Sequence, residues 1–340
     1  MTAKYAPRVS TENRTILQDV IPLDTPLVLQ IEPTNYCNLQ CQFCPIGDRA
    51  FISRQGLGRG TMDLDLFRRM ISDLSKFKHN IKTIHLYGNG EPLIHPDLSG
   101  MIQIAKKSGH VDFIDTTTNG ILLSHNKSEM LVKAGLDKIA ISVNGISDED
   151  YIKNTRTRIH FGRFYENLKH LYNNRGNCKV YIKSISELYT EEERDRFFEM
   201  FSPISDYIFM ENLINPWPGF DVESKMDFKS TKSAFSNKAT MKIVCCSMFY
   251  TMVIKWDGRV SLCCTDWKND LVIGDVREES LKSIWGSDKL YFHQVQQLKG
   301  ERYTNGICRN CNQVWQGIYD NIDPYRGKIL EKMVKLRGEI

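Results

Sequence analysis

The sequence has no apolar run long enough to span a bilayer and no charged-then-apolar start of the kind that marks a signal peptide. It also lacks a polybasic stretch, because the net charge is only +4 and is spread along the chain. These absences argue against a membrane-spanning segment, and the sequence shows no basic patch that would bind nucleic acid or a membrane surface. We therefore expect a cytoplasmic protein with no nucleic-acid or membrane partner.

Cysteine is the residue type whose distribution stands out. Ten cysteines occur in a chain of 340 residues that is 41% hydrophobic and 25% charged, as in ordinary soluble proteins. Three of them lie within residues 37–44, six lie within 245–311, and only Cys178 stands alone. In a reducing compartment such clusters are expected to be metal ligands rather than disulfides.

Between the two cysteine clusters, short β-rich apolar runs alternate with amphipathic helical patterns, which predicts βα units and a parallel sheet. The expected strands cover 27–31, 83–87, 111–116, 138–143, 179–185 and 207–210. Six such repeats are fewer than the eight of a closed barrel. The predicted fold class is therefore α/β with a parallel sheet.

Unusual loops follow the first four of these strands. They are the Cys37-Cys41-Cys44 segment, Gly88-Asn89-Gly90-Glu91-Pro92, Thr118-Asn119-Gly120 and Ser142-Val143-Asn144-Gly145. Parallel α/β folds place their chemistry in the loops at the carboxyl ends of the strands. All four segments are therefore expected on one rim, where they would form a site.

The CxxxCxxC spacing of Cys37, Cys41 and Cys44 can bring three thiolates onto one metal centre, and soft sulfur ligands select zinc, copper(I) or iron–sulfur. A structural zinc or an ordinary cubane takes four protein ligands, so three leave one position open. A redox pair or a zinc knuckle is the alternative. At the next loop, glycines let the backbone approach a ligand, and Glu91 can accept from the ammonium of a bound amino acid or simply cap a helix.

This pattern resembles the radical SAM enzymes, whose core is a partial (β/α)6 TIM-like barrel. The resemblance implies a [4Fe–4S] cluster on Cys37, Cys41 and Cys44 that binds S-adenosylmethionine (SAM) at its open iron. One electron then cleaves SAM to methionine and a 5′-deoxyadenosyl radical, which takes a hydrogen atom from the substrate. The SAM contacts it implies are Phe43, Gly88, Gly90, Glu91, Asn119, Ser142, Asn144 and Lys183, although Asn119 can equally cap a turn and Lys183 can be a solvated lysine.

The second cysteine cluster begins at Cys245-Cys246, continues through a hairpin with an Asp257-Gly258 turn to Cys263-Cys264, and ends at Cys308-Arg309-Asn310-Cys311. It resembles the SPASM/twitch extension found after many radical SAM cores. No cysteine follows Cys311, so we expect one auxiliary [4Fe–4S] cluster and not two. Its expected ligands are Cys245, Cys263, Cys308 and Cys311, with Cys246 and Cys264 as alternates; a zinc ribbon is the other reading.

The expected organisation has five parts: a lead-in over 1–26, a radical SAM core over 27–212, a linker or substrate loop over 213–243, a SPASM/twitch-like domain over 244–312, and a helical tail over 313–340. The lead-in looks irregular and too short for the leader-binding domain of many peptide-modifying relatives. This favours a small polar substrate such as an amino sugar, cyclitol or nucleotide sugar.

With two [4Fe–4S] clusters and SAM, the expected reaction is net oxidation by a dehydrogenase, or epimerisation as a redox-neutral variant. An external flavodoxin- or ferredoxin-like protein would supply electrons. Lys183 and Glu211 are candidate catalytic residues, and Arg156, Asn212 and Trp217 are candidate substrate contacts. The alternatives are a maturase of ribosomally made peptides and, outside enzymes, a two-cluster electron-transfer protein or a zinc-binding module.

Overall fold

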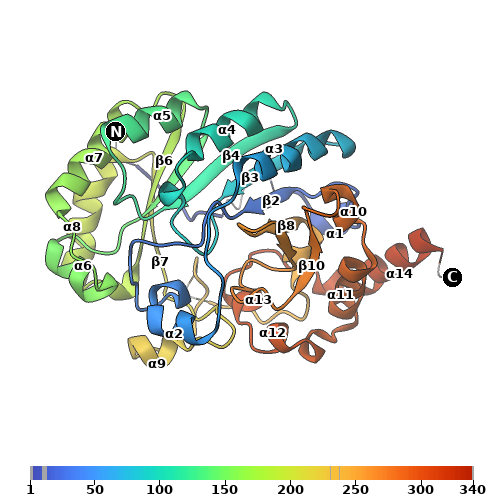
Figure 1. Cartoon of the computed structure of the whole chain (residues 1–340). Coiled ribbons are helices and arrows are strands. Elements are labelled where there is room, and N and C mark those ends of the chain that lie inside the picture. The colour runs from blue at the N-terminus through green and yellow to red at the C-terminus, as the bar shows by residue number, and fades with distance from the viewer. Residues whose placement is uncertain (1–2, 10–13, 230, 237, 339–340) are drawn as a thin grey trace.

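A computed structural model describes residues 3–9, 14–229, 231–236 and 238–338 of the chain (Figure 1). All its named strands belong to one ten-stranded sheet in the order β1-β7-β6-β5-β4-β3-β2-β8-β9-β10. The strands of its parallel part are β1 (Lys4–Tyr5), β2 (Val28–Ile31), β3 (Ile81–Leu86), β4 (Val111–Thr118), β5 (Lys138–Ser142), β6 (Lys179–Ile185), β7 (Tyr207–Glu211) and β8 (Thr251–Ile254).

The strands β2 to β7 are neighbours in chain order and all pair in parallel, as βα repeats require. They match the six strands expected from the sequence, so the α/β partial barrel is confirmed. Each connection passes through helix. The helices on the outer face of the curved sheet in Figure 1 are α3 (Leu64–Ser72), α4 (Leu98–Lys107), α5 (His125–Lys133), α6 (Asp148–Thr155), α7 (Phe161–Asn173) and α8 (Glu191–Phe201). The short helix α2 (Arg49–Arg54) lies apart from them, at the bottom of the view.

Local sequence explains these helices. The Asp97 side chain begins α4 by accepting from the amide of Gly100 at 2.9 Å, and the Thr190 side chain begins α8 in a capping box with Glu193. On α3, Phe67 and Met70 lie one turn apart and are buried against the sheet. The main apolar core therefore lies between helices and sheet, while a separate small apolar cluster of Ala140, Tyr181 and Phe209 lies on the other face of the sheet.

The lead-in is irregular over most of its described residues, as expected, but it contains two short elements. Lys4 and Tyr5 form β1, which pairs in parallel with Tyr207 and Ile208 of β7, and α1 (Leu17–Val20) follows. Two residues are too short a stretch to show any periodicity, so sequence reasoning could not find this strand. Its effect is to carry the residues after it into the mouth of the barrel.

The C-terminal part continues the same sheet, because β8 pairs in parallel with β2 on the side away from β3. The hairpin to β9 (Arg259–Ser261) turns at Gly258, whose φ of 91° suits glycine, and β10 (Val272–Asp275) pairs antiparallel with β9. The helices of this part are α10 (Leu281–Trp285), α11 (Asp288–Lys299), α12 (Gly306–Arg309), α13 (Gln313–Gln316) and α14 (Arg326–Arg337).

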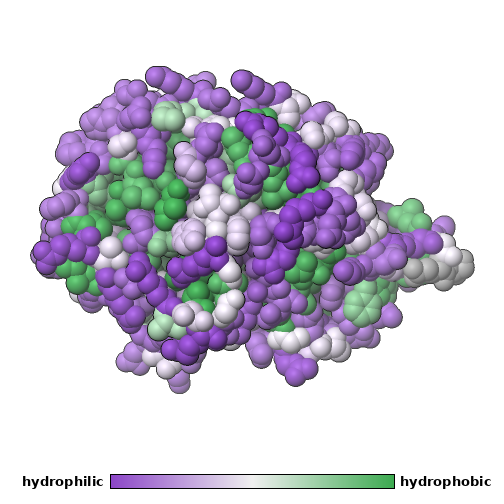
Figure 2. All heavy atoms as spheres, in the orientation of Figure 1, coloured by the Kyte–Doolittle hydropathy of each residue, from purple (hydrophilic) through white to green (hydrophobic). Residues whose placement is uncertain are grey.

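The segment between the two parts holds α9 (Val222–Met226) and returns across the mouth of the barrel. The amide of Asn212 donates to the carbonyl oxygen of Ala234 at 3.0 Å, and the amide of Ala234 donates to that of Gln316 at 2.8 Å. This segment therefore joins the end of β7 to α13. Hydrophilic residues cover most of the face seen in Figure 2, and no helix among the described residues is long and apolar enough to cross a bilayer.

Candidate active site

Cys37, Cys41 and Cys44 lie in the loop that follows β2, at the carboxyl rim of the barrel. Burial raises the pKa of each thiol, to about 12 for Cys37, and the proximity of Cys44 raises the pKa values of Cys37 and Cys41 further. The loop thus gathers three half-buried thiols, and binding iron would remove their protons. The donor set fits a cluster with one open position.

Close packing fixes the path of this loop. A Cβ atom on Gly47 would lie 2.4 Å from the carbonyl oxygen of Cys41, so only glycine fits there. On the other side, the amide of Gln40 donates to the carbonyl oxygen of Thr155 at the end of α6, at 3.0 Å. The loop is therefore packed on one side against its own continuation at Gly47 and on the other side against the end of α6.

The glycines after β3 lie close against the segment that leads to the cysteine loop. A Cβ on Gly90 would lie 2.4 Å from the carbonyl oxygen of Thr34, and one on Gly88 would lie 2.6 Å from Oε2 of Glu32. Their small size lets the turn approach the segment leading to the cysteine loop, while Gly88 also borders the cavity described below. Packing within the protein thus already requires glycine at both positions, while the contacts of Gly88 and Gly90 with SAM stay predictions.

Glu91 joins two rim loops. It is only 2% exposed; its Oε1 accepts from Thr118 Oγ1 at 2.5 Å and from the amide of Leu93 at 3.0 Å, and its Oε2 accepts from the amide of Asn119 at 2.7 Å. The contact with Leu93 is the helix cap that was the alternative reading. A carboxylate oxygen can accept twice, so these contacts leave one position on Oε2 for a ligand ammonium.

The other predicted SAM contacts also lie at this rim. Asn119 donates from Nδ2 to Oδ1 of Asn38 at 2.8 Å, which ties the end of β4 to the cysteine loop. Asn144 is buried, and its carbonyl oxygen accepts from Asn154 Nδ2 at 2.7 Å. Ser142, two residues before Asn144, ends β5. The rim position of these residues agrees with the prediction, while their contacts with SAM stay predictions.

Lys183 and Glu211, the two catalytic candidates, form an ion pair at 2.6 Å between β6 and β7. Burial alone raises the pKa of Glu211, but Lys183 and Arg8 outweigh it and hold that pKa below its usual value. Burial lowers the pKa of Lys183, and Glu211 only partly offsets this. The pair can therefore hold or release a proton inside the barrel.

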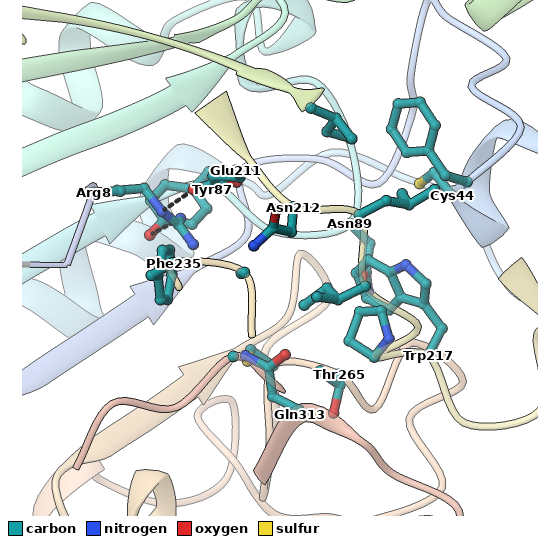
Figure 3. A pocket seen from close by; sticks show the side chains of 18 of the residues that line it. Arg8, Cys44, Tyr87, Asn89, Glu211, Asn212, Trp217, Phe235, Thr265 and Gln313 are labelled. Carbon is teal, nitrogen blue, oxygen red and sulfur yellow. Dashed lines mark hydrogen bonds and ion pairs between the residues drawn. The ribbon is translucent and has the colours of Figure 1, made fainter. Parts of the chain in front are cut away.

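A cavity of about 370 Å³ opens between the barrel and the C-terminal part (Figure 3). Cys44 and Trp217 lie at one side of it, while Arg8, Tyr87 and Glu211 gather at the opposite side. A second cavity of about 400 Å³ extends from it into the barrel and shares Arg8, Tyr87 and Cys264 with it. Both volumes are typical of small-molecule sites.

The substrate candidates differ in their relation to this space. Phe43, Asn212 and Trp217 line the first cavity, with Asn212 Nδ2 also donating to the carbonyl oxygen of Ser233 at 2.8 Å. Arg156 is exposed at the end of α6, in a left-handed conformation with φ 51°, and lines neither cavity. The geometry therefore does not support Arg156 as a substrate contact.

Four cysteines line one small cavity of the C-terminal part: Cys245, Cys263, Cys308 and Cys311. Gln297 reaches two of them, since its Oε1 accepts from the amide of Cys245 at 2.9 Å and its Nε2 donates to Sγ of Cys308 at 3.7 Å. The arrangement suits one fully ligated cluster, because four thiols converge and a glutamine donor faces their sulfur atoms.

The two alternate cysteines point elsewhere. Cys246 is buried in the apolar core, and its thiol donates to the carbonyl oxygen of Asp320 at 3.5 Å. Cys264 lines both large cavities instead of the four-cysteine cavity. The geometry thus favours Cys245 and Cys263 as ligands. Among the described residues, no three Cys, His, Asp or Glu side chains are placed to hold a single metal ion.

Sequence reasoning missed three residues of this site. Thr265 borders both the first cavity and the four-cysteine cavity, and its Oγ1 lies 3.1 Å from Sγ of Cys263. Glu32, 2% exposed, accepts from the amide of Asn89 at 2.8 Å, and burial raises its pKa. Arg8 comes from the lead-in. A carboxylate directly after a buried strand was a usable signal for Glu32; the other two had none.

Two family models match the chain. The Radical SAM superfamily model matches residues 31–199, and the model of an iron–sulfur cluster-binding domain, SPASM, matches residues 245–312. A curated protein of Pyrococcus furiosus, the tungsten-containing aldehyde ferredoxin oxidoreductase cofactor-modifying protein, is 25% identical over 338 residues, covering 84% of this chain and 86% of its own. The GTP 3′,8-cyclase of Chlorobaculum tepidum is 31% identical over 128 residues, but only 36% of its length is matched.

Solved structures share the fold. BtrN in complex with AdoMet and 2-DOIA matches with a TM-score of 0.58 and 18% identity, over 87% of this chain and 97% of that one. Streptococcus suis SuiB bound to precursor peptide SuiA matches with a TM-score of 0.61 and 16% identity, over 88% of this chain and 72% of that one. At such identities the likeness concerns architecture, which includes both the barrel and the C-terminal part.

Proposed function

Since this chain belongs to the radical SAM superfamily and carries a SPASM iron–sulfur domain behind its core, we propose that it is a dehydrogenase acting on a small polar substrate. Membership of this superfamily implies a [4Fe–4S] cluster with SAM in the core and an external reductant. The SPASM domain implies further iron–sulfur. The proposal adds the direction of the chemistry and the class of substrate.

One observation carries the proposal: the first cavity lies between the two sets of thiols. Cys44 of the three-cysteine loop lines it at one side, and Thr265 borders both this cavity and the four-cysteine cavity. Oxidation of a secondary alcohol to a ketone removes a hydrogen atom, an electron and a proton from one carbinol. A substrate in this cavity would have a possible acceptor for each of the three.

The bound groups supply the redox part of this reaction: SAM with the cluster on Cys37, Cys41 and Cys44 supplies hydrogen-atom abstraction, and a cluster on Cys245, Cys263, Cys308 and Cys311 supplies an electron acceptor. The chain supplies the rest. Glu211, held ionised beside Lys183, is placed to accept the hydroxyl proton. Phe43, Trp217 and Phe235 put apolar surface around the cavity, which keeps water from the reacting carbon.

The test uses protein reconstituted anaerobically with iron and sulfide. We expect about eight irons in the wild type and about four in the Cys37→Ala/Cys41→Ala/Cys44→Ala variant, and release of 5′-deoxyadenosine from SAM and dithionite by the wild type alone. A variant that keeps all its iron would refute the assignment of the loop. A panel of amino sugars, cyclitols and nucleotide sugars, assayed in deuterated water, should give an oxidised product without deuterium on carbon.

Epimerisation is the second candidate, and Cys264 favours it. Its thiol borders both large cavities, and a thiol can return a hydrogen atom to a carbon radical from the face opposite the abstraction. The thiyl radical left on Cys264 would then take one electron, which a reduced cluster on Cys245, Cys263, Cys308 and Cys311 would supply, and one proton from solvent. That outcome would place one solvent deuterium on the carbon of an unoxidised product and would be lost in Cys264→Ser. Turnover of a precursor peptide, with none of the panel consumed, would instead refute the small-substrate proposal in both forms.

A further inference from the structure

Arg8 is the one cation that the lead-in places at both large cavities. Pairing of β1 with β7 continues as far as Ala6, whose amide donates to the carbonyl oxygen of Ile208 at 3.2 Å. Two residues later the chain has reached the barrel mouth, and Arg8 lines both cavities. The sheet therefore fixes the approach of this side chain, although it comes from outside the βα repeats.

The other cations of the two cavities have anionic partners of their own. Arg14 Nε donates to Asp320 Oδ1 at 2.9 Å, and Lys138 pairs with Asp115 at 3.1 Å. Glu211 is likewise engaged by Lys183 at 2.6 Å. Each of these pairs is neutral, and an ion pair inside a cavity persists because neither charge is left without a partner.

Arg8 does not have such a partner. Its Nε lies 3.7 Å from Oε1 of Glu211, which already pairs with Lys183 through its other oxygen, and its Nη1 lies 3.4 Å from the hydroxyl of Tyr87. Neither Arg8 Nε nor Glu211 Oε1 has a hydrogen-bond partner, although both atoms are buried. With Lys183 included, the described residues around the cavities thus hold one positive charge more than they hold negative charge.

We propose that Arg8 and Glu211 together bind an anionic group of the substrate, a carboxylate or a phosphate, with Arg8 taking the anion and Glu211 Oε1 accepting from a neighbouring hydroxyl or amine. A guanidinium offers paired donors that match both anions, and an anion here would neutralise the excess charge. This inference rests on the proposed function and narrows its substrate class.

The position of Arg8 assigns this anion to the substrate rather than to SAM. Figure 3 shows Arg8, Tyr87 and Glu211 across the cavity from Cys44, whose loop is the expected SAM end. A substrate in this cavity would therefore place its anionic group beside Arg8. Its reacting carbinol would lie on the Cys44 side of that group, with the hydroxyl directed toward Oε1 of Glu211. Sugar acids, sugar phosphates and nucleotide sugars fit this description, whereas a free amino sugar would bring a second cation to Arg8.

The test measures binding of four monosaccharides of similar size to the reconstituted holoenzyme with SAM: glucuronate, glucose 6-phosphate, glucose and glucosamine. We expect at least one anionic probe to bind about 10- to 100-fold more tightly than glucose, which is the factor that a charged hydrogen-bonding partner contributes. Whether the carboxylate or the phosphate binds more tightly identifies the anion. Equal Kd values for the anionic and neutral probes in the wild type would overturn the inference.

Two variants that remove charges of opposite sign should change anion binding in opposite directions. Arg8→Gln should abolish the preference, whereas Glu211→Gln should strengthen anion binding because it removes the competing negative charge. Arg8→Lys keeps the charge and should keep part of the preference, and Arg163→Gln, at an exposed position of α7, should change nothing. Loss of the preference in Glu211→Gln, or its retention in Arg8→Gln, would contradict the proposal.

Release of 5′-deoxyadenosine separates this inference from the function on which it rests. Arg8→Gln should bind as much iron as the wild type, which shows that the variant has folded. If the wild type itself releases none, the proposed function fails. If the wild type cleaves SAM but shows no anion preference, only the present inference fails.

Discussion

Replacing Glu91 by Gln should destabilise the protein far more than such an isosteric change does on the surface. The carboxylate is 2% exposed and accepts from Thr118 Oγ1, the Leu93 amide and the Asn119 amide. A glutamine can keep its carbonyl oxygen toward Thr118 and Leu93. Its NH₂ group then faces the Asn119 amide, so two donors meet where a charged acceptor stood.

The cost follows from these contacts. A hydrogen bond to a charged group contributes about 1.5–3 kcal/mol, and an orphaned buried donor costs about 1–3 kcal/mol more. Burial raises the pKa of Glu91, although its hydrogen bonds act to lower that pKa, so the buried negative charge is itself destabilising. Because glutamine is neutral, the substitution removes this part of the destabilisation. We therefore expect a net loss of about 2–4 kcal/mol of the free energy of unfolding, a large part of a total of about 5–15 kcal/mol.

Urea unfolding of the reduced apoprotein measures this loss, and Glu193→Gln is the matched control. Glu193 also caps a helix, accepting from the amide of Thr190 at 2.7 Å, but it does so in solvent, so its loss should stay below about 1 kcal/mol. If Glu91→Gln and Glu193→Gln were equally stable, the reasoning from burial would be refuted. If Glu91→Gln is as stable as the wild type but no longer cleaves SAM, Glu91 contributes to SAM binding rather than to the stability of the rim loops.

Three further outcomes are expected. Cys263→Ser should lose about four irons while Cys264→Ser keeps about eight, as iron and sulfide analysis would show, because only Cys263 lines the four-cysteine cavity; equal losses would contradict that assignment. Gly47→Ala should lose the SAM-dependent cluster signal in electron paramagnetic resonance and keep the signal of the auxiliary cluster, because the new Cβ would lie 2.4 Å from the carbonyl oxygen of Cys41. An unchanged spectrum would show that the cysteine loop can shift to accommodate the methyl group. Burial raises the pKa of Cys178 from 9.0 to about 12, so its contribution to stability is present below pH 9 and is lost as the pH rises toward 12. Urea unfolding of the apoprotein measures the free energy of unfolding at pH 8 and at pH 10.5. Between these pH values that free energy should fall by about 2 kcal/mol less in Cys178→Val than in the wild type, and equal falls in the two proteins would contradict the prediction.

The fold was predictable because its signals are local. Each of the strands β2 to β7 is an apolar run bounded by turn residues, and the cysteine loop and the Glu91 turn follow directly from their carboxyl ends. Parallel pairing then places these loops on one rim without any knowledge of distant contacts. The function of single residues was less accessible. Gly88 and Gly90 carry the motif expected of a ligand turn, yet the space they leave is filled by Glu32 and Thr34, which only the packed structure shows.

The charge balance of the cavity could not have been predicted from the sequence, and it bears most directly on the substrate. Lys183 and Glu211 looked like separate candidates, and only the register of β6 against β7 reveals that they neutralise each other. Arg8 precedes the barrel in sequence and reaches it through a strand of two residues, which no pattern signals. Because Glu211 can balance only one of the two cations, the proposed recognition of an anion depends on the segment before the barrel. On this proposal, a residue outside the radical SAM motifs selects the substrate, while the cysteines and the rim loops hold the clusters and SAM.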